Sequence, residues 1–382
     1  MRVLVNCLSL RSGGAVAYLR NLLPLLPPEL DRRNAQLIAL TRADQQHLLP
    51  ASLPGNQRIV VPSAEVVGIM RLVWERRHLG TITRNSGTQV IFTPYQIGTP
   101  VHGVCTVSML RNMEPFFEGN YPYTLKSRVR NHILRVQTRR FLHRSDAVIA
   151  VSEYVADYAR TALALNPDRI TRIYHGRDST FSESASDTDQ GKLHRLGIQH
   201  PYVFSCGSFL PYRRLEDVIN AFADFVAKRV DHPVLVLAGS GTDSHYRNRI
   251  ASLTKTSPFA AQILYVGQVD RDTMVALYRQ SRVFVTSTEI EACPNIALEA
   301  LSAGCRILSA DIPVLREIFS SAATFYPARQ VAALAAGIEH AWTDEAGSAL
   351  LRNAAQARSE AFSWQMCASQ TADLLIRVQS GR

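Results

Sequence analysis

The chain has 382 residues, enough for two or three domains, and its 46% hydrophobic and 19% charged residues are typical of a globular protein. This composition excludes a disordered or coiled-coil chain, and no apolar run approaches the roughly 18 residues that a membrane-spanning helix needs. The 42 Lys and Arg residues outnumber the 32 Asp and Glu residues, and the resulting charge of +10 favours an anionic partner such as a phosphate, a nucleic acid or an acidic lipid. The first residues show no signal-peptide pattern, which predicts a cytoplasmic protein that is at most peripheral on the inner face of the cell membrane.

Short runs of β-branched residues recur along the chain and predict buried parallel strands. These runs cover residues 2–5, 36–40, 58–61, 89–93, 147–151, 202–206, 233–238, 262–266, 282–287 and 306–309. Segments with apolar residues at helical spacing separate them, for example residues 16–26 and 215–225. This alternation predicts an α/β fold of doubly wound parallel sheets.

The polar stretch over residues 179–192 lacks periodicity and predicts a linker near the middle of the chain. We expect an N-terminal domain over residues 1–180, a linker over 181–198, a C-terminal domain over 199–361, and a helix over 362–382 that crosses back to the N-terminal domain. Ser363 is the expected N-cap of that helix. The triplet Asp187-Thr188-Asp189 imitates a metal-binding pattern but falls in the linker, so we expect no metal site. The six cysteines have neither zinc-ligand nor disulfide spacing and are interpreted as buried thiols.

Two glycine-containing loops follow predicted strands. Gly13 and Gly14 come just before a helix, where the backbone can approach a phosphate, although the third glycine of a dinucleotide fingerprint is missing. The second loop begins with Gly207 and Ser208 and continues to Arg213 and Arg214. This loop is suited to binding a phosphate, because one arginine can donate hydrogen bonds to two phosphate oxygens at once. The alternatives are a simple tight turn for the first loop and solvated surface arginines for the second.

Two glutamates frame the start of a later helix. Glu291 lies in the loop after a predicted strand, and Glu299 lies on the helix that follows. The pair can therefore hold opposite ends of one ligand in the crevice beyond the strand ends.

These motifs occur together with His175-Gly176-Arg177-Asp178, with Gly267-Gln268 and with a closing Phe362-Ser363-Trp364. In this order they resemble the retaining glycosyltransferases of family 4. The resemblance implies the GT-B fold, in which two Rossmann-like doubly wound parallel-sheet domains face each other across a cleft. It also implies a metal-independent hexosyltransferase that uses a nucleotide diphosphate sugar as donor, has no cofactor, and serves a glycan or lipid-linked acceptor in cell-surface polysaccharide synthesis.

The resemblance assigns roles to individual residues. Glu299 is expected to accept hydrogen bonds from the ribose hydroxyls, and Glu291 is expected to contact the hydroxyls of the donor sugar. Arg213 is expected to bind the donor diphosphate. Gly14 approaches the same phosphates. The remaining donor-binding residues implied by the motifs are Gly13, Gly207, Ser208, Arg214, Gly267, Gln268, Cys293, Pro294, Asn295 and Ile296. In this family the departing diphosphate is thought to deprotonate the acceptor hydroxyl, so catalysis depends on electrostatics and positioning.

The sequence departs from the family pattern at three places. One is the loop that reads Glu291-Ala292-Cys293-Pro294-Asn295, where the family has a Glu-x-x-Gly-x-Pro-like pattern. Ser208 stands where the family usually has an arginine, and Arg214 and Arg11 are the candidates to replace that charge. Arg111 stands in the place of a histidine near the donor sugar and is expected to be catalytic.

A basic run without any acidic residue extends over residues 119–145. Its seven positive charges are Lys126, Arg128, Arg130, Arg135, Arg139, Arg140 and Arg144. The interleaved apolar residues suit a helix on an anionic membrane surface, and the alternative is a helix docked on its own sheet with a solvated basic face. Nucleic acid is disfavoured because no aromatic stacking platform accompanies the charge.

Two other functions remain open at this stage. One is a GT-B-fold epimerase acting on the nucleotide sugar, which would need general bases that the sequence does not show. The other is a non-catalytic basic membrane-binding module. Donor hydrolysis or transfer, together with product stereochemistry, distinguishes the three.

Overall fold

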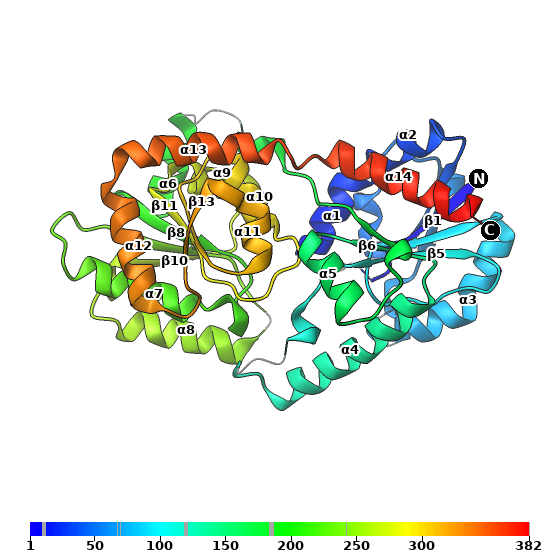
Figure 1. Ribbon diagram of the computed structural model, residues 1–382, viewed down its shortest axis with the longest axis horizontal. Coiled ribbons are helices and arrows are strands. Elements are labelled where there is room, and N and C mark those ends of the chain that lie inside the picture. Colours follow the sequence, from blue (N-terminus) through cyan, green and yellow to red (C-terminus); the bar gives the residue numbers. More distant parts are fainter. Residues whose placement is uncertain are drawn as a thin grey trace. The chain divides into compact units, whose positions relative to one another are not determined.

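The computed structural model describes residues 1–9, 13–66, 68, 70–117, 121–182, 187–241 and 243–381. In these residues the chain forms one parallel sheet of seven strands and another of six (Figure 1). The chain divides into two compact units. Unit 1 comprises residues 1–117, 124–176 and 363–382, and unit 2 comprises residues 118–123 and 177–362. Two Rossmann-like parallel-sheet domains confirm the expected α/β fold class.

The sheet of unit 1 has the strand order β3-β2-β1-β4-β5-β6-β7. Its strands are β1 (Arg2–Asn6), β2 (Gln36–Arg42), β3 (Arg58–Val61), β4 (Val90–Thr93), β5 (Cys105–Leu110), β6 (Ala147–Ala150) and β7 (Ile170–Arg172). Its helices are α1 (Gly14–Leu22), α2 (Leu26–Asp31), α3 (Met70–Ser86), α4 (Leu125–Arg144), α5 (Glu153–Thr161) and α14 (Trp364–Ser380). The interior strand β1 pairs with β2 through Val3 and Leu37 and with β4 through Val3 and Val90, and all three residues are fully or almost fully buried.

The sheet of unit 2 has the strand order β10-β9-β8-β11-β12-β13. Its strands are β8 (Tyr202–Cys206), β9 (Val234–Ala238), β10 (Ile263–Gly267), β11 (Val283–Thr286), β12 (Ile307–Ala310) and β13 (Ala323–Tyr326). Its helices are α6 (Asp187–Arg195), α7 (Leu215–Val226), α8 (Ser244–Thr256), α9 (Arg271–Gln280), α10 (Asn295–Ser302), α11 (Pro313–Phe319), α12 (Val331–Thr343) and α13 (Glu345–Ser359). The order reverses beside β8, so the crevice at the carboxyl ends of β8 and β11 is where such sheets bind ligands.

The middle of the chain differs from the predicted linker. Helix α6 occupies half of the stretch over residues 181–198, and it packs against α9 with Leu193 buried. Asp189 on α6 is also buried and lies 3.5 Å from Arg279 on α9. The polar residues that suggested a linker therefore include one partner of a buried ion pair, which a pattern of apolar residues cannot reveal.

The C-terminal helix α14 belongs to unit 1 and packs against α1, α2, β4 and β5. Its N-cap is Ser363, whose hydroxyl accepts a hydrogen bond from the Met366 amide at 3.4 Å. The Trp364 ring lies 5.5 Å from the ring of Tyr18 on α1. Gly176 passes directly beneath Trp364, because a Cβ at Gly176 would lie only 2.1 Å from the Trp364 nitrogen.

All six cysteine side chains are buried, as the sequence predicts. Within the described ranges, no helix combines the length and the apolar character that crossing a membrane requires.

Candidate active site

Glycines bring the carboxyl ends of β8 and β9 into direct contact. Gly207 and Gly239 have φ angles of +132° and +120°, which side chains other than glycine rarely tolerate. A Cβ on Gly239 would lie 2.0 Å from the Gly207 carbonyl oxygen. The Gly207 amide donates to the Ala238 carbonyl at 3.1 Å. The two loops therefore pack backbone against backbone at the strand ends.

Arg213 lies over this edge and pairs with Glu291. It ends a short 3₁₀ turn (Pro211–Arg213), and a Cβ on Gly207 would lie 3.8 Å from both the Arg213 Cζ and the Ile296 Cδ1 atoms. The Arg213 guanidinium donates to the Glu291 carboxylate, and the two side chains are only 15% and 8% exposed. Burial raises the pKa of Glu291, and the Arg213 charge opposes that rise.

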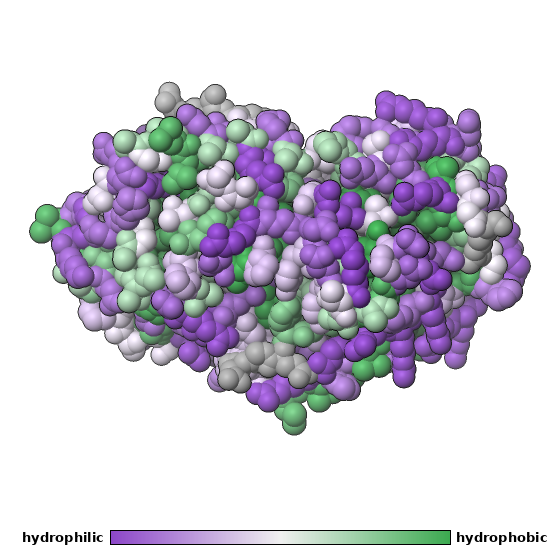
Figure 2. Space-filling view, in the orientation of Figure 1, coloured by the Kyte–Doolittle hydropathy of each residue, from purple (hydrophilic) through white to green (hydrophobic). Residues whose placement is uncertain are grey.

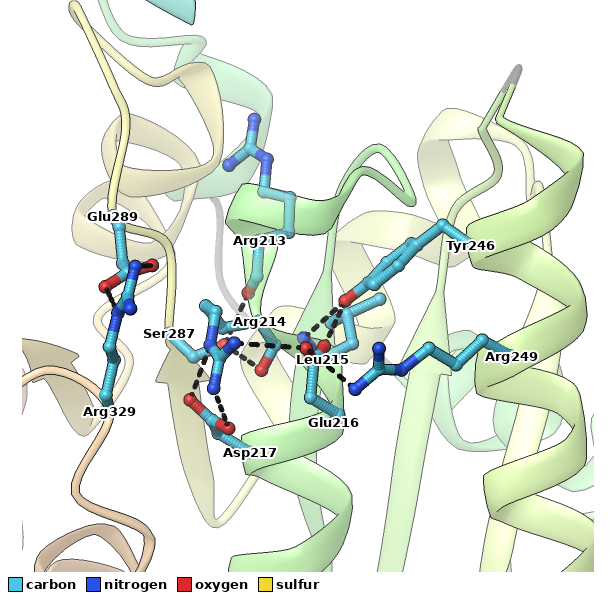
Figure 3. A network of polar contacts seen from close by, with 10 residues as sticks. All are labelled: Arg213, Arg214, Leu215, Glu216, Asp217, Tyr246, Arg249, Ser287, Glu289 and Arg329. Carbon is cyan, nitrogen blue, oxygen red and sulfur yellow. Dashed lines mark hydrogen bonds and ion pairs between the residues drawn. The ribbon is translucent and has the colours of Figure 1, made fainter. Parts of the chain in front are cut away.

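The loop that carries Glu291 is fastened to the turn that carries Arg213. The Ser287 hydroxyl donates to the Arg213 carbonyl at 2.7 Å. The Glu289 amide donates to the Tyr212 carbonyl at 2.9 Å, and the Glu289 carboxylate forms an ion pair with Arg329 (Figure 3). These contacts fix the distance between the two charged side chains.

Arg214 is directed away from this pair. It has a φ of +53° and serves as the N-cap position of α7. Its guanidinium lies 2.7 Å from Asp217 and 3.3 Å from Glu216, and Figure 3 shows the Arg213 side chain pointing the other way. The left-handed backbone at Arg214 thus separates the two neighbouring arginines.

Glu299 projects from α10 into a second polar cluster. The buried hydroxyl of Tyr278 on α9 donates to the Glu299 Oε2 atom at 3.0 Å and lies 2.9 Å from the Cys206 sulfur. Burial raises the pKa of Glu299 from 4.5 to about 7, and the Tyr278 hydrogen bond opposes the rise. Glu299 therefore keeps its proton to a higher pH than an ordinary glutamate does.

In unit 1, Arg111 reaches the glycine loop at the start of α1. Its Nη2 atom donates to the Gly14 carbonyl at 2.8 Å, and its guanidinium carbon lies 5.1 Å from the centre of the Tyr18 ring. Gly13 precedes the helix with a φ of +56°. Arg11 lies outside the described residues.

The other predicted donor-binding residues lie at or near the same strand ends of unit 2. Gly267 ends β10 with a φ of +68°, and a Cβ there would meet no described atom within 4 Å. Ser208 and Gln268 are exposed, Cys293 and Pro294 are buried, and Asn295 and Ile296 are half-buried in the first turn of α10.

Four contributors to this geometry were not identified from the sequence, namely Tyr278, Ser287, Glu289 and Arg329. Each acts through a residue distant in the chain, so no local motif marks it. Among the described residues, no group of His, Cys, Asp or Glu side chains could hold a metal ion.

Comparison with known families agrees with this arrangement. A model of "Glycosyl transferases group 1" matches residues 193–359, and a model of "Glycosyltransferase Family 4" matches residues 12–181. The chain belongs to glycosyltransferase family 4. Together the two models account for most of both units.

Curated proteins and solved structures also resemble this family 4 chain. It is 25% identical over 236 residues to the serotype-specific mannosyltransferase WbdA of Escherichia coli, covering 61% of this chain and 28% of WbdA. It is 22% identical over 241 residues to the alpha-monoglucosyldiacylglycerol synthase of Streptococcus pneumoniae, covering 61% of this chain and 53% of the synthase. The chain thus spans only about a quarter and about half of these two relatives. The structure of Anabaena Alr3699/HepE in complex with UDP-glucose matches with a TM-score of 0.76 at 15% identity over 99% of each chain, which confirms the GT-B fold.

Proposed function

We propose that the protein is a retaining, metal-independent glycosyltransferase that moves a hexose from a nucleotide diphosphate sugar to a glycan or lipid-linked acceptor in cell-surface polysaccharide synthesis. The observation that carries this proposal is the placement of Arg213, Glu291 and Glu299 at the carboxyl ends of neighbouring strands in unit 2. There one cation and two carboxylates with raised pKa values are held by buried contacts. Such groups are typical of a binding and catalytic site.

Glu299 is proposed to accept hydrogen bonds from the ribose hydroxyls of the donor. Burial raises the pKa of its carboxyl to about 7, and two hydroxyl donors would favour the ionised form. Donor binding is therefore expected to release a proton.

Arg213 is proposed to exchange partners when the donor binds. In the free protein its guanidinium is paired with Glu291. The diphosphate would draw the guanidinium to itself, and Glu291 would then accept hydrogen bonds from the sugar hydroxyls. As the bond to the anomeric carbon breaks, negative charge grows on the leaving diphosphate, where the fixed arginine stabilises it. The leaving phosphate takes the proton of the acceptor hydroxyl on the same face of the sugar, which retains the anomeric configuration.

The remaining residues have supporting roles in this proposal. The backbone at Gly13, Gly14 and Gly207 allows the phosphates to approach closely. Arg111 holds the Gly14 carbonyl and supplies positive charge next to that loop. Arg214 stabilises the start of α7 through Asp217 and is not proposed to replace the charge absent at Ser208.

The relatives support the hexose and the acceptor class. The WbdA proteins are named mannosyltransferases, the Streptococcus relative is named a glucosyldiacylglycerol synthase, and the Anabaena structure contains UDP-glucose. The exposed apolar side chains of α4, with Leu125 and Val129 at 78% and 52% exposure among its basic residues, support attachment to an anionic membrane surface.

A thermal-shift panel of UDP, GDP, ADP and dTDP identifies the base, because a ligand at 100 times its dissociation constant adds about 2.7 kcal/mol. Transfer from the matching sugar nucleotide, followed by NMR of the anomeric proton, then tests retention. Glu299→Gln should lose nucleotide binding, whereas Glu345→Gln, at a side chain 86% exposed in the same unit, should keep it.

Each alternative gives a different result in these assays. Inverted product contradicts the retaining mechanism, altered donor sugar without transfer indicates an epimerase, and no nucleotide binding indicates a binding module.

A further inference from the structure

A basic cavity of about 460 Å³ lies between α3 and α4 in unit 1. Arg76 from α3, residues 98–100, and Gln137, Arg140 and Arg144 from α4 line it. The lining residues include no carboxylate. A cavity of this size accommodates a small molecule.

The three arginines of the cavity have no protein partner. No hydrogen bond or ion pair involves the side chains of Arg76, Arg140 or Arg144 in the part of the chain that the structure describes. Other arginines of the same helices are paired, since Arg71 lies 2.6 Å from Glu75 and Arg130 lies 2.6 Å from Glu114. Three converging unpaired guanidinium groups repel one another unless an anion lies between them.

The floor of the cavity is rigid. A Cβ on Gly98 would lie 2.7 Å from the Phe141 Cζ atom, so the loop presses directly on the aromatic ring. Phe141 itself is 3% exposed. The charged side chains therefore extend from a fixed base, and the amide of Gln137 and the hydroxyl of Thr99 add neutral hydrogen-bond donors.

Two of the cavity arginines, Arg140 and Arg144, share one face of α4 with an apolar stripe. Leu125, Val129 and Ile133 repeat every four residues and are 78%, 52% and 48% exposed. Helical spacing continues the same face to Arg140 and Arg144. Figure 2 shows hydrophilic side chains over the part of unit 1 that holds α3 and α4, with hydrophobic ones among them.

We propose that this cavity is a second anion site, distinct from the donor site, that binds the phosphate group of a phosphate mono- or diester through Arg76, Arg140 and Arg144. Arginine suits this ligand because its planar fork of donors matches two phosphate oxygens. The phosphate belongs either to a lipid headgroup, which the neighbouring apolar stripe would bring close, or to a soluble phosphorylated molecule.

The test compares two variants that lose the same charge. The cavity variant is Arg76→Gln/Arg140→Gln/Arg144→Gln. The control is Arg128→Gln/Arg135→Gln/Arg139→Gln, whose three positions fall on a different side of α4. Glycerol 3-phosphate is titrated calorimetrically into the parent and both variants. Each protein is also sedimented with phosphatidylcholine vesicles with and without one third phosphatidylglycerol. The cavity side chains are exposed and unpaired, so the cavity variant should unfold at the temperature of the parent. Both variants should bind nucleotide sugar as the parent does, because the proposed ribose and diphosphate contacts, Glu299 and Arg213, lie in unit 2.

The cavity variant should lose at least tenfold in affinity for one or both probes, and the control should lose much less. A loss of affinity for glycerol 3-phosphate alone identifies a soluble phosphorylated ligand, and a loss of affinity for the vesicles identifies a lipid headgroup. Similar or larger losses in the control would show that only net charge matters and would overturn the proposal. Failure of the parent to bind either probe would overturn it as well.

Discussion

Replacing Glu299 with glutamine should stabilise unit 2 at pH 8 although it removes a proposed ligand contact. The pKa of the Glu299 carboxyl rises from 4.5, its ordinary value, to about 7 in the folded protein. Between these values the folded protein holds a proton that the unfolded chain has released. Stability therefore falls as the pH rises through this range, and the loss persists above pH 7.

The size of this loss follows from the pKa change. A tenfold shift in a protonation equilibrium is worth about 1.4 kcal/mol, so the ionised carboxylate destabilises the fold by about 3 kcal/mol at pH 8 and by less than about 1 kcal/mol at pH 5. Glutamine keeps an oxygen that accepts the Tyr278 hydrogen bond and carries no charge to desolvate. For a unit of this size the gain corresponds to a rise of roughly 6–12 °C in the unfolding temperature at pH 8.

Scanning calorimetry of the parent and of Glu299→Gln at pH 5 and pH 8 measures the effect, with Glu345→Gln as the control. The gain should be several times larger at pH 8, and binding of the nucleotide that the thermal-shift panel identifies should be lost in the same variant. Equal shifts at the two pH values, or a less stable variant at pH 8, would refute the reasoning that Glu299 is destabilised by burial of its charge.

Four further outcomes are expected. Arg213→Ala should lower kcat by about 10²-fold, because a positioned hydrogen-bond donor to the leaving diphosphate is lost, and Arg213→Lys should restore part of the rate. Steady-state kinetics at saturating sugar nucleotide measure kcat, and an unchanged kcat in the alanine variant would assign the role to another residue. Ser287→Ala should lower kcat more than nucleotide affinity, because it loosens the turn that carries Arg213; equal effects on kcat and on Kd would argue against a positioning role. EDTA should leave transfer intact, and activity that EDTA removes and manganese restores would contradict the metal-free proposal. Gly176→Ala should destabilise unit 1 by about 3 kcal/mol, because the new methyl group would collide with Trp364. Thermal denaturation measures this loss, and an unchanged unfolding temperature would show that the backbone shifts to make room.

The strands of the two sheets were predictable because a strand buried on both faces needs a continuous apolar run. The predicted runs at residues 2–5, 202–206 and 306–309 coincide with β1, β8 and β12 within one or two residues. Strands β5, β7 and β13 are not among the predicted runs. Strands β7 and β13 lie at sheet edges and are only partly buried, so their sequences carry no comparable pattern. Strand β5 is buried, but Thr106 and Ser108 interrupt its apolar run.

The residues of the candidate site were predictable where a local motif marks them. They were not predictable where tertiary packing sets the direction of a side chain. The spacing of Glu291 and Glu299 marks a loop and the helix after it, and the structure has that loop and helix. Two adjacent arginines, by contrast, look equivalent in sequence. The left-handed backbone at Arg214 sends one guanidinium to α7 and leaves Arg213 at the strand ends. The pKa of Glu299 is raised by burial and lowered by a hydrogen bond from Tyr278, which comes from another helix, so neither effect can be read from the local sequence.

The return of the final helix to unit 1 has a consequence for synthesis of the chain on the ribosome. Domains usually fold in the order in which they are made. Here unit 1 lacks Trp364 and the buried face of α14 until residues 363–380 emerge, and without them Tyr18 and the backbone at Gly176 lack their contacts with Trp364. All of unit 2 has been synthesised before that point. We expect the second half of the sequence to complete its core first, so that a chain ending at Phe362 keeps the unfolding transition of unit 2 and loses that of unit 1.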